Sequence, residues 1–163
     1  VMIFYNKALF KKAGLDAENP PLATYDEFLA TSKTLVDKGV ADAAIYPAPT
    51  SEFFQSWFDF YPMYAAESGG KQTIEDGKAT FDDEAGQAVW DFWAQMCGDG
   101  YSPQEKYDGD SFADDKAART VVGPWADEVY GESVDWGVVP VPTSAGTAPE
   151  ETYTFSDAKN IGL

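Results

Sequence analysis

The feature that most constrains this chain is the regular alternation of helix-like segments with short apolar runs along its 163 residues. The spacing of apolar residues predicts helices at Lys7–Ala13, Tyr25–Lys38, Glu52–Ala66 and Glu84–Cys97. Short runs rich in Val, Ile, Ala and Tyr predict strands at Val1–Tyr5, Val40–Tyr46, Ala118–Val122 and Trp136–Pro142. Such alternation is typical of an α/β fold. We therefore predict a single α/β domain over residues 1–163, with a mainly parallel sheet flanked by helices.

Local signals support several of these boundaries. Thr24, followed by Glu27 three residues later, has the spacing of a helix capping box. Asp76-Gly77 between two short polar segments predicts a hairpin turn. Asp82 or Asp83 caps the helix Glu84–Cys97.

Two tryptophans occur on this last helix. Trp90 and Trp93 stand among Val89, Phe92 and Met96, and we assign both to the core rather than to a ligand site. Cys97 is predicted to be a buried thiol.

Charge excludes several classes of function. The chain has 28 acidic and 11 basic residues, for a net charge of −17, so nucleic acid and anionic membranes are repelled. There is no histidine, the commonest general base and metal ligand. The acidic residues between Asp108 and Asp115 do not fit a calcium loop, because its glycine is missing and Arg119 occupies position twelve. We predict no cofactor and no metal.

The stretch Phe112–Val129 contains the strongest candidate for a binding residue. An expected helical turn leads into the strand Ala118–Val122, which ends at Gly123-Pro124 and is followed at once by Trp125. The carboxyl end of a strand in an α/β sheet is where ligands collect. Trp125 would present a flat apolar face beside unpaired backbone N–H groups, which suits a sugar ring. The alternative is that Trp125 is a core tryptophan.

A second candidate is the aromatic segment that begins at Glu52. It contains seven aromatic residues up to Tyr64, most of which we assign to the core. Those near its start would share the sheet edge with Trp125.

Six short motifs follow one another over nearly the whole chain. IFYNKALFKKAGLD resembles the pattern YNKxLFKKAGL, and Pro20-Pro21 with TYDEFLATSKTL resembles PPxTWDEFxxxAKxL. Phe112–Trp125 resembles FxxGKAAMxxxGPW. The segments Phe81–Pro103, Trp136–Pro142 and Phe155–Leu163 resemble F…EA…FxxxLxxxGYxxP, GVxPLP and FSGGKNLGI. Together they resemble the maltose-binding-protein-like group of extracellular sugar-binding proteins of bacterial ABC importers.

The resemblance implies a periplasmic-binding-protein-like fold of two lobes, of which this chain covers the C-terminal one. Residues 1–5 and 155–163 would then be crossings to the missing N-terminal lobe, and they should lie close together. The implied ligand is an oligosaccharide held between the lobes, and the implied partners are the permease subunits of the transporter. The parent protein would be extracellular, as a membrane-anchored lipoprotein, or periplasmic.

The resemblance also implies site residues. The family's Gly-Pro-Trp tryptophan stacks on a sugar ring, a role that falls on Trp125. Its aromatic helix supplies a further stacking residue and a carboxylate, which correspond to Glu52, Phe53, Phe54 and Trp57. A glycine turn that borders the sugar is replaced here by Asp157-Ala158-Lys159-Asn160, so Asp157 and Lys159 join the predicted site.

Two further positions depart from the family pattern. Asp115 replaces a glycine. Arg119 replaces an apolar residue, and we expect its side chain to reach solvent or to pair with a carboxylate.

Two other functions compete with non-catalytic sugar binding. A glycosidase would use two carboxylates about 5–10 Å apart, and 28 acidic residues make such a pair easy to find. A structural domain would keep all its aromatic residues in the core. An exposed Trp125 at a cleft would argue against the structural domain.

Overall fold

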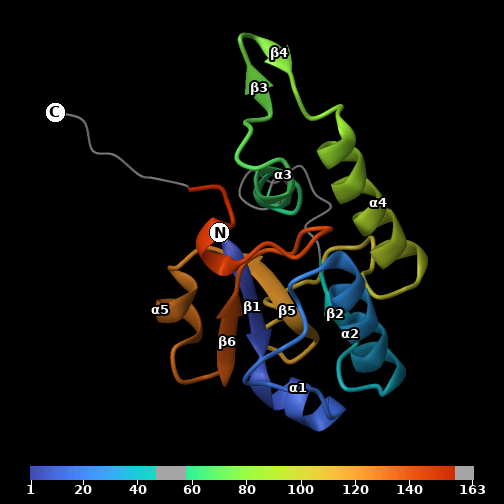
Figure 1. The fold of residues 1–163 in the computed structure, drawn as a ribbon. Coiled ribbons are helices and arrows are strands. Elements are labelled where there is room, and N and C mark those ends of the chain that lie inside the picture. Colours follow the sequence, from blue (N-terminus) through green and yellow to red (C-terminus); the bar gives the residue numbers. More distant parts are fainter. Residues whose placement is uncertain (47–57, 157–163) are drawn as a thin grey trace, which may run out of the picture.

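The computed structural model describes residues 1–46 and 58–156 of the chain, and its main sheet has the strand order β2-β5-β1-β6 (Figure 1). These strands are β1 Met2–Asn6, β2 Ala43–Ile45, β5 Ala117–Val122 and β6 Trp136–Val139. β2 and β5 are parallel, whereas β1 is antiparallel to both β5 and β6. The α/β class and the sheet flanked by helices are confirmed, but the sheet is mixed rather than mainly parallel.

The reason for this correction is the position of β1. A helical crossover fixes the relative direction of the two strands that it joins. β1 instead lies between two strands that come much later in the chain and runs opposite to both. The order of helices and strands along the chain does not predict that β1 lies between β5 and β6.

Five helices and a small hairpin complete the described fold. The helices are α1 Lys7–Ala13, α2 Tyr25–Asp37, α3 Tyr61–Glu67, α4 Glu84–Gly98 and α5 Ala126–Tyr130. The hairpin pairs β3 Ile74–Glu75 with β4 Lys78–Ala79, and a 3₁₀ turn covers Pro149–Glu151. Asp76 and Gly77 both have positive φ, 49° and 73°, as the predicted hairpin turn requires.

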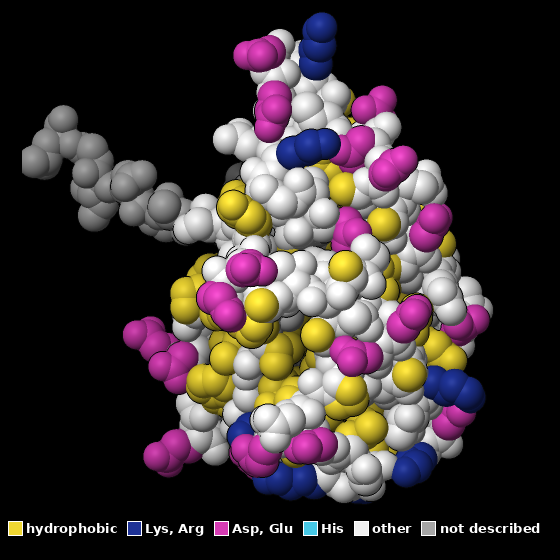
Figure 2. All heavy atoms as spheres, in the orientation of Figure 1, with side chains coloured by type: hydrophobic (Ala, Val, Ile, Leu, Met, Phe, Trp, Pro, Cys, Tyr) yellow, Lys and Arg dark blue, Asp and Glu magenta, His cyan; other side chains and the backbone are white. Residues whose placement is uncertain are grey.

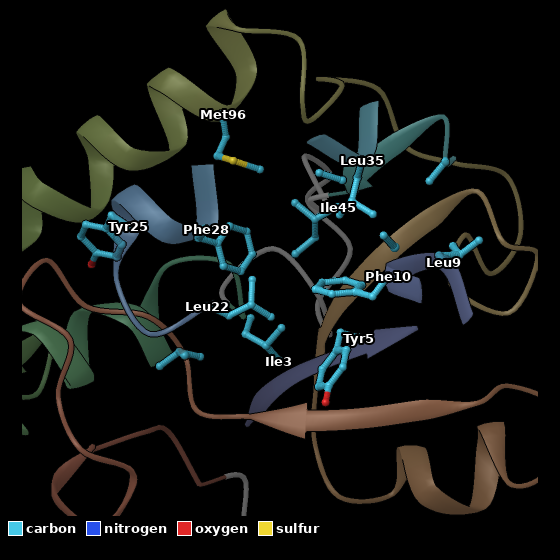
Figure 3. Packing of buried hydrophobic residues seen from close by; sticks show 14 of the residues in the cluster. Ile3, Tyr5, Leu9, Phe10, Leu22, Tyr25, Phe28, Leu35, Ile45 and Met96 are labelled. Atoms are coloured by element: carbon cyan, nitrogen blue, oxygen red, sulfur yellow. The ribbon is translucent and has the colours of Figure 1, made fainter. Parts of the chain in front are cut away.

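The core has two parts because side chains of β1 alternate between the faces of the sheet. Ile3 and Tyr5 belong to the larger cluster, with residues of α1, α2, α4 and β2. Figure 3 shows Phe10, Phe28 and Leu22 converging with Ile3 in this cluster. Phe4 belongs to a smaller cluster with Phe112, Ala126, Tyr130 and Val134. α5 therefore covers one face of the sheet while α1 and α2 cover the other.

The predicted cap of α2 is confirmed. Thr24 Oγ1 accepts the N–H of Glu27 at 3.0 Å, and Glu27 Oε2 accepts the N–H of Thr24 at 3.1 Å. Of the two candidates for the start of α4, Asp83 is the cap, since its Oδ1 accepts the N–H of Gly86 at 3.0 Å.

α3 is shorter than the helix predicted over Glu52–Ala66. Within the described residues the helix begins at Tyr61, and residues 58–60 form a turn. Pro62 explains this start, because proline has no backbone N–H to donate and is tolerated only in the first helical turn.

Trp90 departs from its predicted core position, whereas Trp93 follows it. Trp90 is 66% exposed, while Trp93 packs partly buried against the core and donates its indole N–H to the Asp59 carbonyl at 2.6 Å. The buried residues of α4 are Gly86, Val89, Phe92 and Met96. At about 100° per residue, position 90 points away from this stripe and position 93 lies next to it.

This difference in burial predicts that alanine substitutions of Trp90 and Trp93 reduce the free energy of unfolding by different amounts. Trp90→Ala should change the free energy of unfolding by less than about 0.5 kcal/mol, as expected for an exposed residue. Trp93→Ala should cost about 2 kcal/mol, because it removes packed area and the hydrogen bond to the Asp59 carbonyl. Urea unfolding of both variants measures the difference, and equal losses would contradict the assigned orientation of α4.

Arg119 neither reaches solvent nor pairs with a carboxylate among the described residues. It is fully buried, and its guanidinium donates to the carbonyls of Ala44 and Phe28 at 3.3 Å and to Ser32 Oγ. Its Cζ also lies 3.7 Å from the centroid of the Phe28 ring. Burial lowers the pKa of Arg119 to about 9, which leaves the group charged at neutral pH.

Asp115 has a physical reason to replace glycine. Its φ is 56°, in the left-handed region where glycine is favoured and Asp and Asn are tolerated. Its Oδ1 accepts a hydrogen bond of 2.7 Å from Asn6 Nδ2, and Asn6 in turn caps α1 through Leu9 N. The aspartate thus fixes the side chain that begins α1.

The surface reflects the charge imbalance of the chain. Figure 2 shows acidic side chains spread over the visible face, with basic ones sparse. In the described part of the chain, each helix is too short or too polar to cross a bilayer.

Candidate functional site

The candidate site lies at the end of the sheet where β5 and β6 finish and β1 begins. Met2 pairs with Val122, and Ile3 pairs with Val139, so the carboxyl ends of β5 and β6 flank the start of β1. Val1 N donates to the Phe155 carbonyl at 3.0 Å. The predicted proximity of the first residues and the segment from residue 155 is therefore confirmed as far as the described chain extends.

Trp125 is placed at this edge by the turn that follows β5. Gly123-Pro124 reverses the chain, and the N–H groups of Ala126, Asp127 and Glu128 donate to the carbonyls of the three residues before Ala126 at 3.1–3.2 Å. The expectation of unpaired N–H groups beside Trp125 is wrong for these three. The turn therefore exposes the indole ring of Trp125, whereas these backbone N–H groups of α5 are already hydrogen-bonded.

Four aromatic side chains form what we call the aromatic platform: Trp125, Phe58, Phe155 and Tyr61. The ring centroids of Trp125 and Phe58 are 6.0 Å apart, those of Phe58 and Phe155 6.2 Å, and those of Tyr61 and Phe155 4.9 Å. Phe58 is buried, whereas Trp125 is 43% exposed. Trp125 is thus supported from below and partly open to solvent, which argues against a purely structural tryptophan.

Gly123 lets the Trp125 ring lie against its own backbone. A Cβ at position 123 would sit 1.9 Å from Trp125 Cζ3 and within 2.4 Å of two further ring atoms. A larger residue at position 123 would therefore displace the ring from the platform.

The loop that follows β6 is fixed to α3, which carries Tyr61. Glu67 Oε2 accepts the N–H of Ser144 at 2.7 Å, and its other oxygen accepts the Ser144 hydroxyl. Burial, followed by the charge of Glu67, raises the pKa of the Tyr25 phenol nearby. Tyr25 Oη has no hydrogen-bond partner among the described residues. The two hydrogen bonds of Glu67 therefore hold the loop after β6 against α3.

The other predicted site residues lie outside the described residues. These are Glu52, Phe53, Phe54, Trp57, Asp157 and Lys159. Conversely, the platform includes Phe58, Tyr61 and Phe155, which the sequence reading did not assign to the site. For Tyr61, the sequence contained a usable signal in Pro62, because a proline favours the first turn of a helix and thus places Tyr61 at the start of α3.

The carboxylates once considered for calcium serve separate purposes. Asp110 Oδ1 accepts the N–H groups of Phe112 and Ala113, and Asp114 accepts the hydroxyl of Tyr107 at 3.0 Å. Asp115 is bonded to Asn6. Across residues 1–46 and 58–156, no three potential ligands gather into a metal-binding group.

The aromatic platform lies at the carboxyl edge of an α/β sheet, which is where ligands commonly bind in such folds. The sequence profile of one family, described as bacterial extracellular solute-binding protein, matches residues 1–160. The chain belongs to that family. Among curated proteins, none matches significantly.

Solved structures share this fold. The cyclic α-maltosyl-1,6-maltose binding protein of Arthrobacter globiformis is 24% identical with a TM-score of 0.75, over 94% of this chain and 38% of that one. An ABC transporter solute-binding protein of Thermotoga lettingae, bound with α-D-tagatose, is 26% identical with a TM-score of 0.68, over 86% and 38%. The GacH receptor of Streptomyces glaucescens, solved with acarbose, is 27% identical with a TM-score of 0.65, over 89% and 38%. The chain thus spans less than two fifths of each of these proteins.

Proposed function

We propose that this chain is the C-terminal lobe of a two-lobe sugar-binding protein that delivers its ligand to an ABC importer. The observation that carries the proposal is the half-exposed Trp125 on the aromatic platform, at the edge where residues 1 and 155 meet. A sugar ring packs its C–H face on an aromatic ring and hydrogen-bonds through its hydroxyls. The tagatose and acarbose complexes of related folds support a carbohydrate ligand.

The remaining parts of the proposal rest on the resemblance of the sequence motifs to sugar-binding proteins of ABC importers. A sugar would be enclosed between this lobe and an N-terminal lobe, with Glu52, Phe53, Phe54, Trp57, Asp157 and Lys159 as further contacts. Closure of two lobes around a ligand is a common hinge motion. The permease subunits would receive the closed protein. The parent protein would be held outside the cell as a lipoprotein or in the periplasm, and it would bind sugar without cleaving it.

The proposal predicts a selective loss of affinity on substitution of Trp125. In the two-lobe protein, Trp125→Ala should weaken sugar binding by about 1–3 kcal/mol, the range for losing one well-packed aromatic contact. Gly123→Ala should reproduce part of this loss, because its methyl group displaces the ring. Titration calorimetry with a panel of sugars measures both effects.

Val138→Ala is the matched control, since Val138 on β6 is 41% exposed, nearly as much as Trp125. It should leave affinity unchanged. A Trp125→Ala variant that unfolds while its folded fraction binds normally would assign Trp125 a structural role. Release of cleaved sugar by the unaltered protein would instead favour a glycosidase.

A further inference from the structure

A second aromatic surface lies beside α3. It is a groove of about 660 Å³ between α3, the β3–β4 hairpin and the first half of α4. Phe60, Tyr61, Phe81 and Trp90 provide its apolar walls, with Asp82 and Gln87 among its polar ones. This volume is within the usual range for small-molecule sites, about 300–1,000 Å³.

The aromatic walls of the groove are held in place from behind. Phe81 meets Phe60 edge-on, with 6.0 Å between ring centroids and an interplanar angle of 80°, and Phe60 stacks on buried Tyr64 at 5.9 Å. The Tyr64 hydroxyl donates to the Thr80 carbonyl at 2.8 Å. Trp90 projects from α4 outside its buried stripe. The groove is therefore a formed surface whose exposed tryptophan serves no packing need.

The polar groups of the groove favour a neutral, hydroxylated ligand. The Asp83 carboxylate accepts hydrogen bonds from Lys71 Nζ at 2.7 Å and from the N–H of Gly86. Asp82, in contrast, is exposed on the rim of the groove. The charged residues that line the groove are both carboxylates, in a chain of net charge −17, so an anionic ligand is disfavoured. Carboxylate and amide groups beside aromatic faces match sugar hydroxyls and C–H faces.

Tyr61 connects the groove with the aromatic platform. It lines the groove, and its ring also packs 4.9 Å from Phe155, which contacts Phe58 below Trp125. We propose that the groove binds the outer rings of an oligosaccharide whose first ring stacks on Trp125. This inference rests on the proposed function, and it assigns Trp90 as a residue that selects ligands by length.

Indole N–H signals in NMR spectra of the 163-residue chain test this directly. One lobe supplies only part of the contacts, so millimolar affinity is expected, and chemical-shift titration can measure it. The probes are gluco- and galacto-oligosaccharides of two and six rings. The Trp125 signal should shift with both lengths, and the Trp90 signal with six-ring sugars only. The Trp136 indole, bonded to the Gly131 carbonyl at 3.2 Å, serves as the internal control.

Substitution of Trp90 separates the groove from the platform. Trp90→Ala should weaken binding of the six-ring sugar about tenfold and leave the two-ring sugar unchanged. Trp90→Phe keeps an aromatic face and should keep most of the affinity. Because Trp90 is exposed, both variants should fold.

Each other outcome overturns the inference. If Trp125 responds and Trp90 does not, the groove takes no sugar while the proposed function stands. If neither signal moves with any sugar, both proposals fall. If Trp90 responds to tetramethylammonium but to no sugar, the groove is a cation site formed by its aromatic faces and carboxylates.

Discussion

Replacing Arg119 with methionine is expected to raise the free energy of unfolding by about 1–3 kcal/mol. Arg119 is completely buried without a carboxylate among the described residues, and its charge is met only by two carbonyls, one hydroxyl and the Phe28 ring. Exchanging a buried charge for an apolar side chain of similar volume is often neutral or stabilising by about 1–4 kcal/mol. Equilibrium unfolding in urea measures the change.

Two further substitutions separate charge from volume at the same position. Arg119→Ala should lose about 3 kcal/mol or more, because it leaves a cavity in the core. Arg119→Lys should also be less stable than the unaltered chain, because it keeps a buried charge and loses the planar fork that reaches three acceptors. A methionine variant that is less stable than the unaltered chain would show that the hydrogen bonds and ring contact outweigh desolvation.

The pH dependence of this difference has a defined sign. Burial lowers the pKa of Arg119 to about 9 in the folded state, below its value in the unfolded chain. Above pH 9 the unfolded state therefore binds more protons at this group, so its contribution to stability rises with pH. The advantage of Arg119→Met should be constant below about pH 9 and shrink above it. Unfolding of both proteins from pH 7 to 10.5 measures this trend, and a growing advantage would contradict it.

Gly86→Ala is expected to cost about 3 kcal/mol or more, although alanine is the better helix former. A Cβ on Gly86 would lie 1.7 Å from the Phe81 carbonyl oxygen and 2.8 Å from its carbon. Both are backbone atoms, and the N–H of Gly86 is also bound to the cap residue Asp83. Residues 81–83 must therefore move, which breaks the cap and shifts the hairpin relative to α4.

Gly98 on the same helix is the matched control. A Cβ on Gly98 meets nothing within 4 Å. Gly98→Ala should therefore gain up to about 1 kcal/mol from helix propensity alone. Thermal and urea unfolding of the two variants should give shifts of opposite sign. Similar shifts would mean that the Phe81 carbonyl does not lie against Gly86.

Local patterns in the sequence predicted the elements whose causes are local. The capping box at Thr24 and Glu27, the turn at Asp76-Gly77 and the strand that ends at Gly123-Pro124 each depend on residues within a few positions. The helical spacing also held enough information to place Trp90 correctly, because position 90 lies off the stripe of Val89, Phe92 and Met96. Trp90 was wrongly assigned to the core because its residue type was given more weight than its angular position on the helix.

Composition and spacing determined the α/β class, the repulsion of polyanions by the net negative charge, and the choice of Trp125 as a candidate binding residue. Only the tertiary structure decided that β1 lies antiparallel between β5 and β6, that Arg119 is buried on the Phe28 ring, and that Phe58, Tyr61 and Phe155 support Trp125. These features join residues far apart in the chain, such as Ile3 with Val139 and Phe58 with Phe155. Periodicity reports which face a residue occupies on its own element, whereas the partner on the facing element is chosen by packing of the whole core.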